Sequence, residues 1–122
     1  MAATQIQSQA EEEVSKLKTL ELDREKYMQN RQELEMKLSE STNVKQELDL
    51  MDDDAKIFKL IGAVLVRQDL DEAKSTVDKR LQFIESEIKR VEANITDCNK
   101  KTDAQREKVT KLMQAMQAAA KK

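Results

Sequence analysis

Apolar residues recur at a seven-residue spacing in two long stretches of this chain, and that spacing is typical of paired helices. Each seven-residue repeat has two inner positions, which face the partner helix. In the first stretch these positions recur every seven residues from Ile6 and from Ala10, and eight of the fourteen are apolar. In the second, a frame that starts at Val77 and Leu81 makes eleven of thirteen apolar. We therefore expect a coiled-coil core that includes Leu34, Leu38, Leu48, Val77, Leu81, Ile84, Ile88, Val91, Ile95 and Cys98.

Possible helix ends are marked by local sequence signals. Thr4 with Gln7 three residues on, and Asp69 with Glu72, each resemble a capping box at a helix start. The acidic triplet 52–54 opposes the negative end of a helix dipole, so it marks the exit from the first helix. These signals predict helices over residues 4–52 and 70–119, each roughly 70 Å long at about 1.5 Å per residue.

Two helices of nearly equal length around one central interruption predict an antiparallel pair within one chain. Pairing them about Gly62 makes facing residue numbers sum to about 125. The register then predicts four pairs: Leu48 with Val77, Leu34 with Val91, Tyr27 with Cys98, and Arg24 with Thr102. The last pair is polar and is expected to fix the register at some cost in stability.

The segment 56–68 between the helices differs in kind. Eight of the ten residues from 57 to 66 are apolar, most of them β-branched or aromatic, and the only glycine of the chain lies at their centre. This pattern predicts two short strands joined by a tight turn. Alternation then places Phe58, Leu60 and Leu65 on one face of the hairpin, and Ile57, Ile61, Val64 and Val66 on the other.

A two-stranded hairpin that is apolar on both faces is marginal in water and has open edges. Two slender helices cannot cover both faces, so we expect other chains to do so. Burial of about seven large apolar side chains would contribute roughly 10–20 kcal/mol before ordering and association costs. The alternative is a connector buried by its own helices. The predicted assembly residues are Ile57, Phe58, Leu60, Ile61, Gly62, Val64, Leu65 and Val66.

Composition argues against catalysis and against several kinds of partner. The 122 residues include no His, one Cys, one Gly and no Pro, so acid–base groups, a cysteine-based metal site and a phosphate-binding loop are missing. We expect no enzyme activity, no cofactor and no metal, and a core role for Cys98. The longest apolar run has seven residues, whereas a membrane span needs about twenty.

Net charge changes along the chain, from seven basic and fourteen acidic residues in 1–54 to twelve basic and nine acidic residues in 71–122. The two arms should therefore attract each other. The overall charge of −2 and the lack of aromatic residues among the basic ones speak against nucleic acid. No secretion signal is recognisable at the N-terminus, so we expect a cytoplasmic protein without membrane contact.

The order of long helix, short apolar hairpin and long helix resembles the β-type subunits of the prefoldin family. The segments that carry the resemblance are Val44–Leu48, Phe58–Gln68, Val77–Leu81 and Glu87–Arg90, and the likeness covers essentially the whole chain. Ala63 stands where the family commonly has Pro, and Arg67 replaces the usual Lys. The resemblance implies a single prefoldin domain over residues 1–122.

What the resemblance implies about function is an ATP-independent co-chaperone. It implies a heterohexamer of two α-type and four β-type subunits whose hairpins form an inter-subunit β-barrel, with coiled coils below. The tips of the coiled coils would hold non-native proteins such as actin and tubulin, which are passed to the cytosolic group II chaperonin.

In this chain the tips would be formed by residues 1–17 and 109–122, where apolar side chains lie among polar ones. Fraying helix ends expose inner positions, and methionine adapts to many shapes. The alternative is that several of these residues simply close the coiled coil. The candidate client-binding residues are Ile6, Ala10, Val14, Leu17, Leu112, Met113 and Met116. A competing function is a coiled-coil scaffold or tether that uses the hairpin only to oligomerise.

Overall fold

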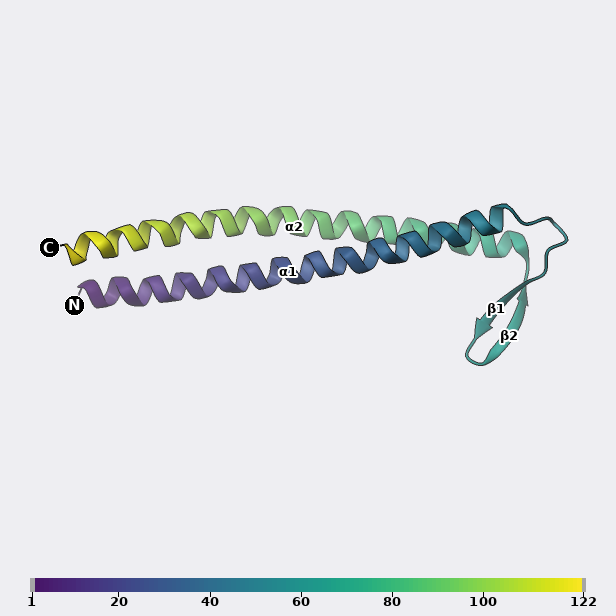
Figure 1. The fold of residues 1–122 in the computed structure, drawn as a ribbon, viewed down its shortest axis with the longest axis horizontal. Helices are drawn as coiled ribbons and strands as arrows, with labels where there is room; N and C mark the ends of the chain where they lie inside the picture. The colour runs from purple at the N-terminus through teal and green to yellow at the C-terminus, as the bar shows by residue number, and fades with distance from the viewer. Residues whose placement is uncertain (1, 122) are drawn as a thin grey trace. The chain divides into compact units, whose positions relative to one another are not determined.

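The computed structural model describes residues 2–121, with side chains from residue 4 onward. Helix α1 (Ala2–Asp49) is followed by strands β1 (Ile57–Ile61) and β2 (Val64–Gln68) and by helix α2 (Leu70–Ala120), as Figure 1 shows. The predicted fold class is confirmed: the chain is mainly helical, with two long helices and one antiparallel β-hairpin.

Two compact units divide the chain. The terminal unit combines residues 1–30 with 91–122, and the hairpin unit comprises residues 31–90. Each unit contains a segment of α1 and a segment of α2, and each is described by itself below.

The start of α1 differs from the prediction. The helix begins at Ala2, so Thr4 lies inside it and the predicted cap at Thr4 is wrong. Alanine at position 2 is the best helix former, and nothing in the next residues breaks a helix.

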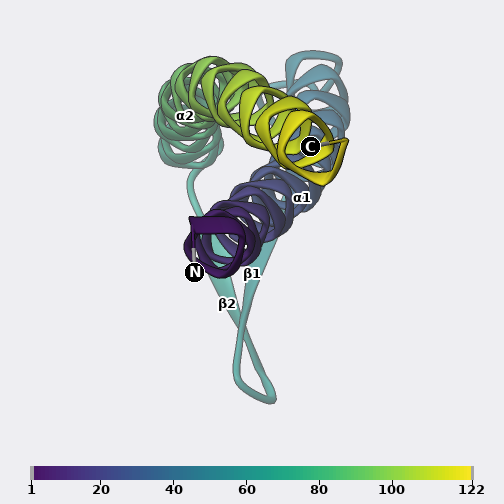
Figure 2. The same cartoon turned by 90° about the vertical axis from the view of Figure 1, so that its left-hand side faces the viewer.

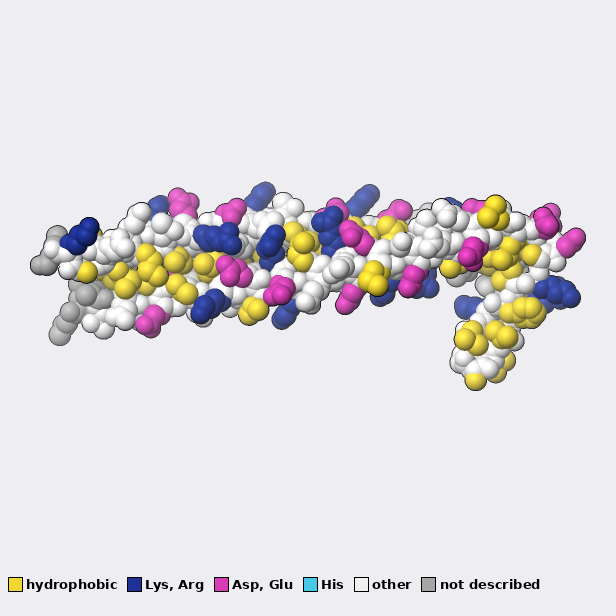
Figure 3. Space-filling model, in the orientation of Figure 1, with side chains coloured by type: hydrophobic (Ala, Val, Ile, Leu, Met, Phe, Trp, Pro, Cys, Tyr) yellow, Lys and Arg dark blue, Asp and Glu magenta, His cyan; other side chains and the backbone are white. Residues whose placement is uncertain are grey.

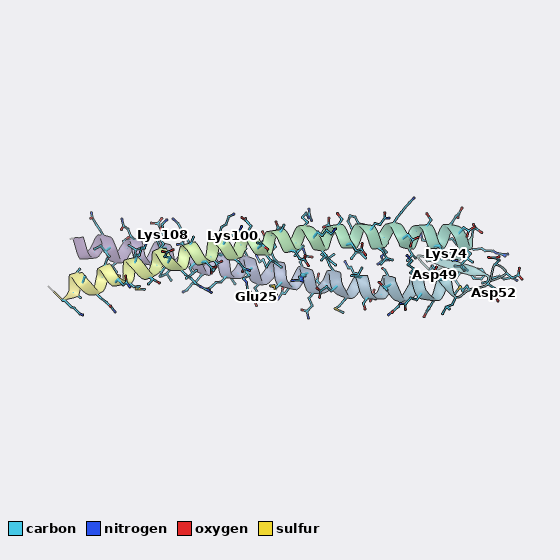
Figure 4. The ribbon with its side chains drawn as sticks, turned by 90° about the horizontal axis from the view of Figure 1, so that it is seen from above. Glu25, Asp49, Asp52, Lys74, Lys100 and Lys108 are labelled. Atoms are coloured by element: carbon cyan, nitrogen blue, oxygen red, sulfur yellow. The ribbon has the colours of Figure 1, made fainter. Side chains whose placement is uncertain are left out.

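The end of α1 comes at Asp49, three residues before the predicted one, and Asp52 lies in the connection beyond it (Figure 4). The Leu50 N–H donates to the carbonyls of both Gln46 and Glu47, at 3.2 and 3.3 Å. The Met51 N–H donates to Leu48 O at 3.2 Å, so the last turn tightens to three-residue spacing and the helix stops. The carboxylates of 52–54 then follow the helix rather than ending it.

The start of α2 agrees with the prediction. The Asp69 carbonyl accepts a hydrogen bond of 2.9 Å from the Ala73 N–H, which is the first helical hydrogen bond of α2. Asp71 and Glu72 lie in the first turn, where the helix dipole favours negative charge.

The hairpin pairs Ile61 with Val64 at the turn and Ile57 with Gln68 at its base. Gly62 has a φ of +60°, and no other described residue has a positive φ. This geometry corresponds to a type II′ turn, in which the first central residue needs a positive φ and glycine adopts it without strain. The pairing places Phe58, Leu60 and Leu65 on one face, as the alternation predicts.

In the terminal unit, the segments of α1 and α2 run antiparallel, and Figure 2 shows both chain ends facing the viewer. Its buried apolar residues are Ala10, Val91, Ile95 and Cys98. The Cys98 thiol donates a hydrogen bond to Leu20 O at 3.4 Å. Cys98 and Tyr27 line the same small cavity, in agreement with their predicted pairing.

In the hairpin unit, Leu48, Leu70 and Ala73 form a buried cluster against which Ile57 and Val77 pack. The predicted pair Leu48–Val77 is therefore confirmed. The pair Leu34–Val91 joins residues of different units and stays a prediction. Among the ten expected core residues, six are buried, and four are half-buried: Leu38, Val77, Leu81 and Ile88.

Two ion pairs join the helices inside the units. Arg106 of α2 lies 3.6 Å from Glu21 of α1, as the charge of the two arms predicts. In the hairpin unit the polarity is reversed, because Lys45 of α1 lies 3.0 Å from Asp78 of α2. The hydrogen bond from Lys45 to Asp78 raises the pKa of Lys45. The net charge of a helix therefore does not determine which helix supplies the basic residue of an individual ion pair.

Candidate functional site

The hairpin carries a concentrated exposed apolar surface. Six of its apolar side chains are between 45% and 67% exposed. Figure 3 shows hydrophobic side chains, in yellow, gathered over the face of the hairpin that is in view. The six residues are Phe58, Leu60, Ile61, Val64, Leu65 and Val66. Exposed side chains lie on both faces of the pairing, so the alternative of a connector buried by its own helices does not hold.

The base of the hairpin packs against the helix ends, whereas its other apolar side chains are exposed. Ile57 is half-buried and packs against the cluster of Leu48, Leu70 and Ala73 at the adjoining helix ends. The hairpin is thereby attached to the helices through one apolar contact region, and its remaining apolar side chains stay free for a partner.

The strands β1 and β2 form a two-stranded sheet, so within the described residues both outer edges lack a neighbouring strand. An open edge presents unpaired N–H and C=O groups that can pair with another chain. Two exposed apolar faces and two open edges together distinguish this hairpin from a core element.

The seven residues predicted to form the client-binding tip differ in exposure. Ala10 is buried at 4% exposed, and Met113 is 44% exposed. The others are half-buried: Ile6, Val14, Leu17, Leu112 and Met116.

Four of these residues line one hollow of about 390 Å³ in the terminal unit, between the segments of α1 and α2. Ala10 and Val14 come from α1, and Met113 and Met116 come from α2. Ser15, Lys18 and other polar residues complete its lining. The structure thus brings one buried, two half-buried and one exposed apolar side chain together around one hollow, and their role in client binding stays a prediction.

A polar layer formed by Glu13 and Gln105 joins the two helices in the terminal unit, and the sequence does not predict this contact. The Gln105 amide of α2 donates to the Glu13 carbonyl at 2.9 Å and also to the Glu13 carboxylate. The hydrogen bond from Gln105 lowers the pKa of Glu13, and the ammonium groups of Lys16 and Lys108 act in the same direction. Glu13 and Gln105 both occupy inner positions of the seven-residue frame, and this shared placement is the sequence feature that could have indicated their contact.

The predicted polar contact near Arg24 is present, with a different partner. Arg24 and Thr102 line the same hollow. The Arg24 Nε donates to Asn99 Oδ1 at 2.7 Å, whereas the Thr102 hydroxyl donates to the Cys98 carbonyl at 2.8 Å. A residue three positions earlier on α2 therefore pairs with the arginine, because Thr102 satisfies its hydroxyl on its own helix.

Over residues 2–121, neither helix contains a stretch that is long and apolar enough to cross a membrane. The same residues include no group of three or more acidic, Cys or His side chains placed to hold a metal ion.

Comparison with known proteins gives consistent results. The family described as "Prefoldin subunit" matches residues 11–116. A Caenorhabditis briggsae protein named "Probable prefoldin subunit 6" is 69% identical over 110 residues, which cover 90% of this chain and 86% of that protein. The human protein named "Prefoldin subunit 6" is 45% identical over 114 residues, which cover 93% and 88%.

The fold comparison agrees with the sequence comparisons. The crystal structure of the prefoldin beta subunit from Thermococcus strain KS-1 matches with a TM-score of 0.70 and 21% identity, over 91% of each chain. Prefoldin subunits are chaperone subunits and not enzymes. Family match, relatives and fold together establish that this chain belongs to the prefoldin family, as a subunit of the prefoldin co-chaperone complex.

Proposed function

We propose that this chain acts in the cytoplasm as a β-type subunit of a heterohexameric prefoldin, folded as a single domain over residues 1–122. In this proposal it assembles with α-type and other β-type subunits. The complex holds non-native, actin- or tubulin-like proteins without ATP, and delivers them to the cytosolic group II chaperonin.

The hairpin supports the assembly part of the proposal, and its exposure is the observation that carries it. Leu60 and Leu65 face each other across the strands and are 67% and 65% exposed. Covering side chains of this size stabilises an association by about 1.5–3 kcal/mol each. Partner hairpins that add strands at both edges, closing an inter-subunit β-barrel, would cover faces and edges together.

The hollow in the terminal unit supports the client-binding part. Methionine is unbranched and polarisable, so Met113 and Met116 can adapt to apolar segments of different shape. A single hollow of this kind binds weakly, and several subunits in one complex bind the same client more tightly. Weak individual contacts allow transfer to a stronger acceptor without nucleotide.

The test is aggregation of a denatured protein in the presence of the reconstituted complex. Complex with the intact chain is expected to suppress aggregation. Deletion of residues 1–10 and 113–122 is expected to remove this chain's share of client capture while the mass of the native complex falls only by the deleted residues.

A deletion of residues 119–122 alone serves as the control, because it leaves Met113 and Met116 in place. Loss of assembly in the larger deletion contradicts the proposed division between tip and hairpin. An intact complex that fails to suppress aggregation supports the scaffold or tether instead.

A further inference from the structure

A second and larger groove lies in the terminal unit, with a volume of about 650 Å³. Lys16 and Leu20 of α1 line one side, and residues of α2 from Lys101 to Lys111 line the other. The tip hollow shares none of these lining residues, so the two are distinct features.

Lysines dominate the rim of the groove. The groove is bordered by four of them: Lys16, Lys101, Lys108 and Lys111. The acidic residue among its lining residues is Glu107, which lies 3.7 Å from Lys111 in a pair that is more than 70% exposed on both sides. Such an exposed pair is weak, so Lys111 can exchange Glu107 for another carboxylate at little cost.

Two more rim lysines have carboxylate partners within the chain. Lys101 lies 3.1 Å from Asp97 in a pair that is 64% exposed on both sides, which is again weak. Lys16 lies 3.3 Å from Glu13, beside the groove. The hydrogen bond from Gln105 is the largest cause that lowers the pKa of Glu13, and the hydrogen bond from Lys16 and the charges of Lys108 and Lys16 follow it. With four lysines and one carboxylate in its lining, the groove carries a positive charge.

The floor of the groove is apolar. Leu20 and Ala104 contribute to it beside the polar Thr19 and Gln105, and the methylene stems of the rim lysines extend it. An occupant thus meets an apolar floor between positively charged edges.

The length of the groove sets the length of the occupant. Lys101 and Lys111 are ten residues apart on α2, which corresponds to about 15 Å along the helix. An extended chain covers the same distance with four or five residues at about 3.3 Å each. In an extended chain alternate side chains point to opposite sides, so apolar residues can contact the floor while carboxylates between them reach the lysines.

We propose that this groove binds extended segments of non-native proteins in which acidic and apolar residues alternate. The inference rests on the proposed function and adds a chemical preference to it. The tip hollow accepts apolar segments generally, whereas the lysine-lined groove selects acidic ones among them.

The test uses three fluorescein-labelled peptides and the reconstituted complex. In each peptide three leucines alternate with three glutamates, three lysines or three serines, between Gly-Ser ends. Anisotropy titrations are expected to give a lower Kd for the glutamate peptide than for the other two. Raising the salt from low to about twice physiological strength is expected to remove most of that difference, because exposed charges are screened.

The test variant is K108E/K111E, and the matched control is K26E/K100E. Lys108 lines the groove and Lys100 does not, and both are labelled on α2 in Figure 4. All four lysines of the two variants are exposed, and each variant changes the charge of the terminal unit equally. The test variant is expected to bind the glutamate peptide about three- to tenfold more weakly, and the control about as well as the intact chain.

A neutral variant, K108Q/K111Q, checks that repulsion among the new glutamates is not the cause of the loss. It is expected to show a smaller loss in the same direction. A photo-crosslinking glutamate peptide is expected to label residues 101–111 in the intact complex.

Three outcomes would overturn the inference: equal affinity for the glutamate and lysine peptides, equal losses in the test and control variants, or crosslinks confined to other regions. If any of these occurs while the complex still suppresses aggregation, the inference fails and the proposed function stands. If the intact complex suppresses no aggregation, the proposed function itself fails.

Discussion

Two sets of apolar residues differ in what covers them: those of the hairpin, and those at the inner positions of the seven-residue repeat, which form the seam between the helices. Ile84 and Ile95 are 3% and 8% exposed within the chain itself, whereas Leu60 and Leu65 are more than 60% exposed. A seven-residue repeat gathers apolar side chains into one stripe that a single helix can cover. Alternation spreads them over two faces, which no single neighbour covers. The chain therefore covers the apolar residues of the seam by itself and leaves those of the hairpin exposed, as the proposed assembly requires.

The strongest way to break this comparison is to place charge on the hairpin. L60D/L65D removes two leucines that would each contribute about 1.5–3 kcal/mol on burial, and it adds carboxylates that resist burial. We expect assembly to weaken by at least about 100-fold while the helix content of the chain stays the same. Native mass measurement and circular dichroism test the two parts.

The control for that variant is L22D, at an exposed leucine of α1. It introduces the same kind of charge away from the hairpin, and assembly should persist. An L60D/L65D chain that still enters the complex at normal concentration contradicts the assembly role of the hairpin.

A substitution in the seam is expected to have a smaller effect, which is confined to the stability of the helices. Ile84→Ala leaves a cavity at a side chain that is 3% exposed and should destabilise α2 by about 2–5 kcal/mol, with assembly through the hairpin retained. Phe83→Ala, next to it and 65% exposed, should change stability by less than about 0.5 kcal/mol. Hydrogen exchange of the amides in residues 81–95 measures both. Equal effects of the two substitutions would contradict the burial of Ile84 in the seam.

The turn offers a test that sharpens the hairpin side of the comparison. Gly62→Ala places a side chain at a φ of +60°. No other atom lies within 4 Å of the added Cβ, so there is no steric clash. The backbone conformation itself, however, is strained by about 1–2 kcal/mol for alanine. We expect faster hydrogen exchange in β1 and β2 and weaker assembly, with the seam unchanged. Ala63→Ser, at the other central position of the turn, should leave exchange as it is.

The smallest expected effect concerns Glu13. Its pKa is lowered in the folded chain by the Gln105 hydrogen bond, so its contribution to stability is present above the unfolded pKa. That contribution is lost as the pH falls through the lower, folded pKa. A carbon-13 titration of the Glu13 carboxyl should give a value below 4.5, and Gln105→Leu should move it upward. An unchanged value in that variant would contradict the polar layer.

Much of the fold followed from residue patterns, because each long element repeats one simple rule. The seven-residue frame placed Ile84, Val91 and Cys98 inward, and all three are buried. The hairpin followed from β-branched residues around the single glycine. The end of α1 did not follow, because it depends on the backbone hydrogen bonds of Leu50 and Met51 rather than on the acidic triplet.

The functional surfaces were only partly predictable. Pattern could place Met113 and Met116 near the chain ends, but it could not predict that they share a hollow with Ala10 and Val14. The lysine-lined groove was also missed, because its rim combines residues of two helices at outer positions, where the frame gives no signal. Contacts between elements depend on side-chain length and on the local register of the helices.

The contact of Ile57 with the buried cluster of Leu48, Leu70 and Ala73 has a consequence for the rate of assembly. It holds the base of the hairpin against the helix ends, so the orientation of the ribbon is set before any other subunit arrives. In the proposed assembly an incoming subunit docks on a preorganised template, and less conformational freedom is lost at the moment of encounter. Loosening this anchor would therefore slow the joining of subunits even where every contact between them is preserved.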